Sequence, residues 1–446
     1  MPPETLTPPE PQPLSKAQVL RSMRWNIGAG FLGMVWVAAA TGMALPLFMQ
    51  SIQASGFQLG LLSGSRQLAM LAQLPGALLG ERLPSRKPMW ALCVSLHRAL
   101  WAVPALLPWL LPSDQHLWPV WIIASLGLSE LLSNSGTPLW YSWMADLLPP
   151  HRAGSFWGRR HRILSISLLI ASLLFAAALE FHSQHGYLGF QLIFATAALF
   201  GVADILVHLG VHEPTPRRSA SGAGLWKRIT APLASREFRI LTAAMGIWAA
   251  ATTLPGYTNG LPSFFAVVYL RETFHASYLQ ASSIFIASAL GAILFAPKIG
   301  AWIDHHGARK TAAALMLIGP LLSLAWIGAR PAQMHLGLAS LPHPILLLAL
   351  ASLGVGGAFA GVIFCQARLT QQFTDNSGRT IAMGLHWSLV GLMGTAAALL
   401  AGWIKDHPHS LTWLLPDSIS YFQFLVLLEV ALIWCIALPL LLRLPD

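Results

Sequence analysis

The sequence predicts an all-α polytopic membrane protein in which twelve transmembrane helices form two six-helix bundles. Hydrophobic residues make up 55% of the 446 residues and charged residues only 10%, whereas soluble domains carry about 25% charged residues. Apolar runs long enough to cross a bilayer as helices recur along the whole chain. Two short charged stretches interrupt these runs half a chain apart, which indicates two similar halves.

Twelve apolar runs have the length expected of spanning helices, about 17–25 residues or slightly more. They lie near residues 25–50, 58–80, 89–111, 119–145, 163–182, 189–211, 239–270, 277–301, 311–330, 343–366, 380–403 and 419–442. Most of the 27 lysines and arginines fall in the alternate loops that share a side with both chain ends. Because basic loops stay in the cytoplasm, we expect both termini there. The basic charge is thus a topology signal and not a nucleic-acid-binding patch.

A segment rich in small and polar residues separates the two halves. We expect a disordered cytoplasmic arm over 1–24, an N-terminal six-helix bundle over 25–211, a cytoplasmic linker over 212–238 and a C-terminal six-helix bundle over 239–446. We expect no cleaved signal peptide before the first run. The three cysteines all fall inside predicted spans, so we expect no disulfide framework, no metal site and no cofactor.

The two charged stretches share a pattern, an acidic residue followed by basic ones. They are residues 81–87 and 304–310, and their acidic residues are 223 positions apart (304 − 81). A carboxylate at a helix end that pairs with arginines of a neighbouring loop can hold one side of a two-state protein closed. The predicted cytoplasmic gate comprises Glu81, Arg82, Arg86, Asp146, Arg152, Asp304, Arg309, Lys310 and Arg379. The alternative is that the basic residues only set topology and the acidic residues only cap helices.

With these loops the chain resembles the major facilitator superfamily over nearly its full length. The family pattern Gly-x-x-x-Asp-x-x-Gly before basic residues is present at Gly300, Asp304 and Gly307. The first copy is degraded, with Glu81 in place of the aspartate. The loop over 146–160 is similar to one in poorly characterised bacterial members. The resemblance implies a multi-pass transporter of the bacterial cytoplasmic membrane, and it does not name a substrate.

Ionisable residues inside apolar runs are functional candidates, because a charge at the bilayer centre costs at least about 2.5–3.5 kcal/mol. Arg66, Arg98 and Glu130 are expected at similar depths near the midplane. They either bind a solute or a coupling proton, or form a structural ion-pair network within one bundle. Glu429 lies near the middle of the last run and is a candidate proton carrier, with packing against a neighbour as the alternative.

Polar residues of the fourth run recur at helical spacing. Glu130, Asn134, Thr137 and Tyr141 share one face, which in lipid must meet protein or water. We expect this face to line a cavity, with a ladder of hydrogen bonds to a neighbouring helix as the alternative.

The seventh run should break near mid-depth, because it holds two prolines and two glycines within 254–262. The first run has Gly42 and Pro46 at a comparable position. Interrupted helices at matching points of two halves indicate a central binding site. Tyr257 and Asn259 are therefore candidate ligand contacts, the alternative being a kink needed only for bending.

His386 and Trp387 in the eleventh run are further binding candidates, since an imidazole titrates near neutral pH and an indole can stack on a solute. A hydrogen-bonded structural histidine is the alternative reading of His386.

These features predict a monomeric secondary transporter, not an enzyme, that moves a small polar or anionic organic solute by alternating access. A phosphate-binding loop is not recognised, so an ion gradient, with protons as the candidate ion, or the solute's own gradient is expected to supply the energy. The alternatives are a polytopic acyl or glycosyl transferase and a membrane sensor that has lost transport. A convergent set of catalytic residues is not recognised.

Overall fold

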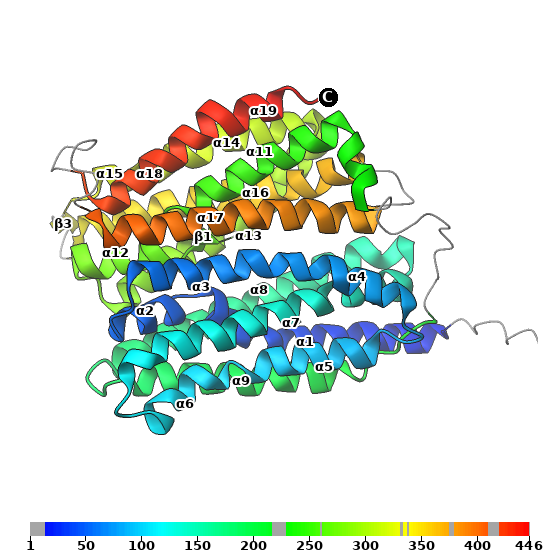
Figure 1. Cartoon of the computed structure of the whole chain (residues 1–446), viewed down its shortest axis with the longest axis horizontal. Helices are drawn as coiled ribbons and strands as arrows, with labels where there is room; N and C mark the ends of the chain where they lie inside the picture. Colours follow the sequence, from blue (N-terminus) through cyan, green and yellow to red (C-terminus); the bar gives the residue numbers. More distant parts are fainter. Residues whose placement is uncertain are drawn as a thin grey trace, which may run out of the picture.

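A computed structural model describes residues 14–215, 229–258, 261–330, 333–336, 339–373, 379–408 and 419–445. The long helices run side by side along the longest axis of the molecule (Figure 1). Helices of the first half of the chain, blue to teal, lie below those of the second half, green to red, in this view. The first and last described residues lie at the same end of the bundle, which we call the terminal end; the opposite end is the distal end.

The first half of the chain is entirely helical between its loops. Its elements are α1 (Lys16–Thr41), α2 (Ala44–Ser51), α3 (Gly56–Leu68), η1 (Ala69–Ala72), α4 (Gln73–Arg82), α5 (Lys87–Ala99), α6 (Ala102–Leu110), η2 (Gln115–Leu117), α7 (Trp118–Leu147), α8 (Pro150–Phe181) and α9 (Leu188–His208).

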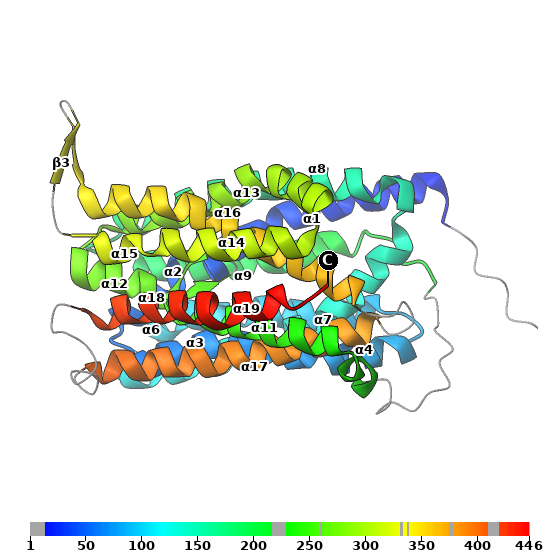
Figure 2. The same ribbon diagram turned by 90° about the horizontal axis from the view of Figure 1, so that it is seen from above.

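The second half adds two small hairpins to its helices. Its elements are η3 (Ala231–Ala234), α11 (Arg236–Thr253), β1 (Tyr257–Thr258), β2 (Leu261–Pro262), α12 (Phe264–Phe274), α13 (Tyr278–His306), α14 (Ala308–Ser323), α15 (Ala325–Gly328), β3 (Gln333–Leu336), β4 (Ala339–Pro342), α16 (His343–Gln372), α17 (Arg379–Asp406), α18 (Tyr421–Leu432), the π-helical η5 (Ile433–Ala437) and α19 (Leu438–Leu442). Both hairpins are antiparallel, and β3–β4 projects from the distal end (Figure 2).

The predicted all-helical membrane architecture is confirmed. Nine helical segments of the described residues are long and apolar enough to cross a membrane. The other three predicted runs correspond to α3–η1–α4, to α7 and to α11–α12, so every predicted run coincides with helical structure. The count of twelve crossings stays a prediction.

Both predicted interruptions are present. Helix α1 ends at Thr41, and α2 begins at Ala44 after a bend at Gly42. Helix α11 ends at Thr253, and the β1–β2 hairpin separates it from α12. Gly256 in this bend has a φ of 88°, which favours glycine because a Cβ is disfavoured there. Its backbone also approaches that of Phe265, since a Cβ on Gly256 would lie 2.7 Å from the Phe265 nitrogen.

The apolar core is shared by the halves at the distal end and divided toward the terminal end. The distal cluster combines Phe48 and Phe194 of the first half with Phe264, Phe285 and Phe422 of the second. Toward the terminal end each half has its own cluster, and all the described residues of each cluster belong to one half. Because burial of apolar area stabilises contact, the distal end is where the halves are held together most firmly in this conformation.

Two carboxylates join the halves at the distal end. Asp406, the last residue of α17, accepts hydrogen bonds from the backbone N–H groups of Gly56 (2.6 Å) and Phe57 (2.7 Å) at the start of α3. Glu180 near the end of α8 accepts one from Leu279 (3.2 Å) at the start of α13. The first N–H groups of a helix lack intrahelical acceptors and carry partial positive charge, so an anion is favoured at both positions.

These two contacts occupy equivalent places in the two halves. Helices α3 and α13 both begin with a Ser-x-x-Gln capping box, at Ser55 and Ser277, 222 positions apart. Asp406 and Glu180 are 226 positions apart. Each half thus supplies one helix N-terminus and one carboxylate, which is the relationship expected of an internal repeat.

Small residues let α3 pack closely against α17. Gly56 and Gly402 face each other, and a Cβ on Gly60 would collide with the carbonyl oxygen of Ala398. A Cβ on Gly64 would lie 3.3 Å from Thr395. Small residues at every fourth position allow two helix backbones to approach in a membrane protein.

Candidate functional site

A central cavity lies between the two halves, midway along the helices. Its volume is about 230 Å³. The first half contributes residues of α1, α3–η1 and α7, and the second half contributes residues of α11, its following bend, α16 and α17. The polar and aromatic lining residues are Trp36, Thr41, Ser63, Arg66, Gln67, Glu130, Asn134, Trp248, Thr252, Thr253, Tyr257, Gln366 and Trp387.

Arg66 and Glu130 form an ion pair in this cavity. The Arg66 Nε lies 3.4 Å from Glu130 Oε1, and the two side chains are only 14% and 17% exposed. Arg66 also donates to the carbonyl oxygen of Ala40. Ala40 lies in the last turn of α1, where carbonyl groups lack intrahelical donors because the helix is interrupted. The interruption of the first run therefore fixes the guanidinium beside Glu130.

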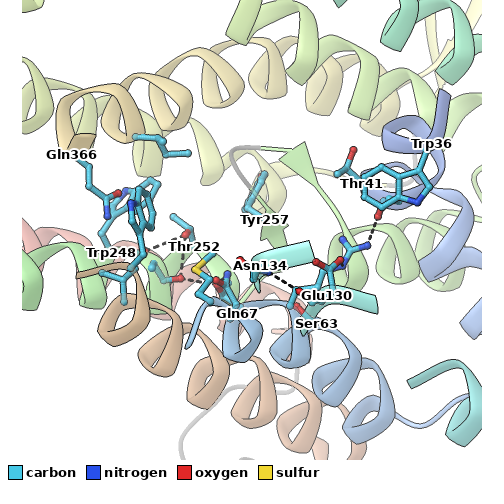
Figure 3. Close-up of a pocket in the computed structure, with 18 residues that line it drawn as sticks. Trp36, Thr41, Ser63, Gln67, Glu130, Asn134, Trp248, Thr252, Tyr257 and Gln366 are labelled. Carbon is cyan, nitrogen blue, oxygen red and sulfur yellow. Dashed lines mark hydrogen bonds and ion pairs between the residues drawn. The ribbon is translucent and has the colours of Figure 1, made fainter. Parts of the chain in front are cut away.

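Hydrogen-bonding and stacking groups face the same space from both halves. Figure 3 shows Gln366 and Trp248 on one side of the cavity, Trp36 and Glu130 on the other, and Tyr257 between them. Three tryptophans and three amide side chains line the cavity. Such a lining can sandwich a flat or ring-shaped solute and bond to its polar edges.

A second pocket, which we call the side pocket, lies inside the first half. It too has a volume of about 230 Å³. It is lined by Gly30, Gly33, Met34, Trp90, Val94, Arg98, Ser133, Thr137, Trp140, Tyr141, Arg160, Asp204, Ile205 and His208. The predicted face of the fourth run is therefore divided: Glu130 and Asn134 line the central cavity, whereas Thr137 and Tyr141 line the side pocket.

Arg98 pairs with Asp204, which is not among the predicted site residues. Its Nη2 lies 3.3 Å from Asp204 Oδ2, and its guanidinium stacks over Trp36 at 3.6 Å from the ring centroid. Two glycines make room for the pair. A Cβ on Gly33 would lie 2.9 Å from the Asp204 carboxyl carbon, and one on Gly201 would lie 2.8 Å from Arg98 Cδ. Asp204 stands alone in the sixth apolar run, and that isolated carboxylate was a signal in the sequence.

His386 and Trp387 have different surroundings although they are neighbours. His386 is fully buried, with Nδ1 2.9 Å from the Thr242 hydroxyl and Nε2 2.8 Å from the Gln366 amide nitrogen. Both ring nitrogens are therefore engaged within the second half, and a binding role for His386 stays a prediction. Trp387 lines the central cavity. Asn259 lies outside the described residues.

Tyr257 lines the central cavity and is anchored behind it. Its hydroxyl accepts a hydrogen bond from Trp326 Nε1 at 2.8 Å. Glu429 does not line the cavity. It is fully buried in α18, where Ser323 Oγ donates to its Oε1 at 3.3 Å.

Arg86 and Asp146 of the predicted gate are paired at the terminal end, within the first half. Arg86 Nη1 lies 2.8 Å from Asp146 Oδ2, and Arg86 Nε lies 3.2 Å from Glu213 Oε1. Glu213 was not predicted. It follows α9 and also accepts from the Ser85 hydroxyl at 2.6 Å and the Lys87 backbone N–H at 3.2 Å.

Burial alone would raise the pKa of the Glu213 carboxyl. Hydrogen bonds from the Ser85 hydroxyl and from the backbone N–H groups of Arg86 and Lys87 outweigh burial and lower this pKa below the usual value for glutamate. The carboxylate thus ties the start of α5 to the end of α9 at neutral pH.

The remaining gate candidates lie apart from this cluster or outside the description. Arg82, Asp304 and Lys310 are exposed. Arg309 Nη1 donates to the carbonyl oxygens of Leu442 (3.1 Å) and Leu444 (2.8 Å) near the chain end. The side chains of Glu81, Arg152 and Arg379 lie outside the described part of the structure. Their gating role stays a prediction.

Among the residues that the structure describes, no group of three or more histidine, cysteine, aspartate or glutamate side chains is placed to hold a metal ion.

No family model matches the sequence, and no curated protein matches it. Solved structures match it over nearly the whole chain. A mutant of the nucleoside transporter NupG superposes with a TM-score of 0.71 at 12% identity, covering 94% of this chain and 98% of that one. The fold is that of the major facilitator transporters.

Two further structures show the same likeness. A bacterial homologue of the iron transporter ferroportin, in an inward-facing state, has a TM-score of 0.63 at 14% identity and covers 96% of this chain and 99% of that one. A D-xylose-proton symporter has a TM-score of 0.61 at 15% identity, with coverages of 96% and 97%. At these identities the likeness concerns the fold, and the site has to be argued from its own residues.

Proposed function

We propose that the protein is a secondary transporter that carries a small, uncharged polar organic solute across the membrane by alternating access. The observation that carries this proposal is the central cavity, in which amides, hydroxyls and tryptophans of both halves face one space. A site shared by two halves changes whenever the halves rock against each other, so binding and conformational change are coupled there.

The charges of the cavity favour an uncharged solute. Among the described residues, Arg66 and Glu130 are the charged residues that line it, and they are paired with each other. The positive charge of Arg98 is taken up by Asp204. An anion would have to compete with Glu130 for the guanidinium, whereas an uncharged solute can bond to both partners of the intact pair. The structure therefore supports the polar alternative over the anionic one.

The amides and tryptophans also indicate the kind of solute. Gln67, Asn134 and Gln366 each offer a donor and an acceptor, which suits hydroxyl groups or the edge of a heterocycle. Trp36, Trp248 and Trp387 offer flat apolar faces. A solute of roughly the size of a monosaccharide or nucleoside fits this chemistry. Among the structures of the same fold, NupG is a nucleoside transporter and another is a xylose symporter.

The conformation described corresponds to a distal-closed state of the transport cycle. The shared distal core and the contacts of Asp406 and Glu180 join the halves on the distal side of the cavity, and we infer that they close the path to that side. We assign the terminal end to the cytoplasm of a bacterium, following the basic loops, and take the monomer as the transporting unit. Transport, and not an enzymatic reaction, is the activity inferred from this arrangement.

A ligand screen on the purified protein tests the proposed substrate class. Uncharged nucleosides and sugars, together with anionic metabolites of similar size, are added singly while thermal unfolding is followed. We expect an uncharged solute to raise the unfolding temperature, because binding to the folded state stabilises it. The effective solute is then supplied in radiolabelled form to proteoliposomes, where we expect uptake.

Matched variants show whether the solute binds in the central cavity. Trp387→Ala should abolish both stabilisation and uptake, whereas Trp109→Ala, at a residue 69% exposed on the outside of the bundle, should abolish neither. Stabilisation by anions alone, or an undiminished effect in Trp387→Ala, would contradict the proposal.

A further inference from the structure

Glu429 is a buried carboxyl group that does not line the central cavity. It is fully buried in α18, and among the residues that the structure describes its Oε2 has no hydrogen-bond partner. Its Oε1 accepts a hydrogen bond from the Ser323 hydroxyl at 3.3 Å. Within the described part of the chain, no lysine, arginine or histidine lies within 4.0 Å of this carboxyl.

Unlike Glu429, the carboxyl groups of Glu130 and Asp204 inside the helical bundles are each paired with an arginine. Glu130 has Arg66 beside it, and Asp204 has Arg98. An ionised carboxylate without counter-charge and with an unsatisfied oxygen is strongly disfavoured in a dry, apolar environment. A neutral carboxylic acid is tolerated there, because it needs no counter-ion. The surroundings of Glu429 therefore suit its protonated form.

Three interrupted helices meet around this group. The chain bends between α11 and α12, α14 ends at Ser323 before the short α15, and α18 passes into the π-helical segment η5 four residues after Glu429. Interruptions of this kind mark places where helices change shape, and π-helical segments are frequent at functional sites. Glu429 thus lies where a change of charge would act on several movable elements.

Two neighbouring hydrogen bonds link the surroundings of Glu429 with the central cavity. The Ser323 hydroxyl at the end of α14 donates to Glu429. Tyr257 in turn bonds to Trp326 and lines the cavity. The donors to Glu429 and to Tyr257 are thus only three residues apart along the chain, so a shift of the α14–α15 junction would act on both groups.

Few other ionisable groups of the described residues lie on the elements around this position. Of the elements packed against α18, α11 is followed by Tyr257, α17 carries His386, α12 carries Tyr269 and η5 carries Cys435. His386 is engaged with Thr242 and Gln366, and Tyr269 stacks on Phe422. The arginines, lysines and acidic residues of these helices and of α14 lie in their end turns.

We propose that Glu429 is a proton-binding site, that it is protonated in the distal-closed conformation, and that loss of its proton drives the protein toward the distal-open conformation. The ionised form needs water or a counter-charge, which the present packing withholds and which rearrangement of the three interrupted helices would supply. The site would give the transporter its proton coupling, and in that respect the inference rests on the proposed function. Proton binding itself requires no solute, so it can be tested separately.

Infrared spectroscopy of the purified protein tests the protonation state directly. We expect a carbonyl band of a protonated, weakly hydrogen-bonded carboxylic acid at neutral pH that is lost in Glu429→Gln. The band should persist in Glu272→Gln, which removes an exposed carboxylate at the distal end. Absence of the band from the wild type, or its persistence in Glu429→Gln, would overturn the proposal.

A distance measurement between spin labels on the distal ends of the two halves tests the coupling. Raising the pH from about 6 to about 10, a range that covers the titration of buried carboxyl groups, should shift the wild type toward the longer distance. Glu429→Gln, whose neutral amide imitates the protonated acid, should stay at the short distance throughout. A wild type that ignores pH, or a variant that responds as the wild type does, would refute the coupling. Failure to find any transported solute would leave both results standing.

Discussion

Hydrogen bonds from the backbone N–H groups of Gly56 and Phe57 to Asp406 join the two halves at the distal end, so neutralising Asp406 should loosen that end. The substitution Asp406→Asn keeps one acceptor oxygen but removes the negative charge and one acceptor of the N–H groups of Gly56 and Phe57. The two N–H groups belong to the first residues of α3 in the first half, and Asp406 is the last residue of α17 in the second half. The substitution therefore weakens a contact between the halves and leaves each half intact.

The expected loss is about 1.5 kcal/mol. A side chain that caps a helix N-terminus contributes about 0.5–2 kcal/mol, and a charge at an exposed helix end contributes about 0.3–1 kcal/mol. Asp406 is exposed, so larger values for buried charge-assisted hydrogen bonds do not apply. A loss of this size changes the ratio of distal-closed to distal-open molecules roughly tenfold.

Spin labels measure this ratio as a distribution of distances. Gln184 and His407 are exposed at the distal ends of the two halves and can be replaced by cysteine in a background lacking Cys93, Cys365 and Cys435. We expect Asp406→Asn to enlarge the long-distance population relative to the short one by roughly the factor above, which follows from the lost contact energy.

Glu272→Gln is the matched control for this experiment. It also neutralises a distal carboxylate, but one whose ion pair with Lys405 (3.0 Å) stays within the second half. It should leave the distances unchanged. Equal distributions for Asp406→Asn and the wild type would refute the idea that this contact holds the distal end closed. An equal shift in the control would show that charge alone, and not the helix cap, is responsible.

Three further predictions concern other contacts. Glu130→Gln leaves the Arg66 charge unpaired, which should lower the free energy of unfolding by about 3 kcal/mol. Thermal unfolding should show this destabilisation, and adding Arg66→Gln should relieve it, while uptake is abolished in both variants. Full uptake by either variant would exclude the pair from the mechanism. Gly60→Ala should enlarge the distal distances because its Cβ meets the facing carbonyl, whereas Gly158→Ala, in open space, should not; unchanged distances would contradict the packing argument. The pKa of Glu213 is lowered in the folded protein, so its carboxylate stabilises the fold at neutral pH, and this stabilisation is lost as pH falls below about 4.5. On acidification the unfolding temperature of the wild type should therefore fall more steeply than that of Glu213→Gln. Parallel curves would refute this contribution.

Much of the fold follows from features that leave a local trace in the sequence. Apolar runs of spanning length predict the long helices, and the prolines and glycines of 254–262 predict the break that presents Tyr257. Such signals depend on a residue and its near neighbours along the chain, so a single sequence contains them.

Contacts between segments far apart in the chain are harder to predict from the sequence. Arg66, Arg98 and Glu130 were recognisable as intramembrane charges, but which arginine pairs with the carboxylate depends on how α3, α5 and α7 are rotated against one another. Arg98 pairs with Asp204, and Arg66 is the arginine that pairs with Glu130. Helix rotation is set by packing, and in this case by two glycines that make room for the second pair.

The distal contacts were missed because their residues look ordinary in isolation. Asp406 and Glu180 lie at helix ends, where a carboxylate suggests only solvation. Their role in joining the halves depends on the folded structure, in which each carboxylate accepts hydrogen bonds at a helix N-terminus of the other half. The matching capping boxes at Ser55 and Ser277 were the available signal, since they repeat at nearly half the chain length.

Access to the central cavity from the two sides of the membrane tests the account most directly. Thr253 lines the cavity, so Thr253→Cys in the background without native cysteines can be exposed in sealed vesicles to a membrane-impermeant thiol reagent from either side. Alternating access predicts labelling from both sides, with Asp406→Asn increasing the rate from the distal side and decreasing it from the terminal side. Labelling from one side only, in the wild type and in Asp406→Asn alike, would contradict the account.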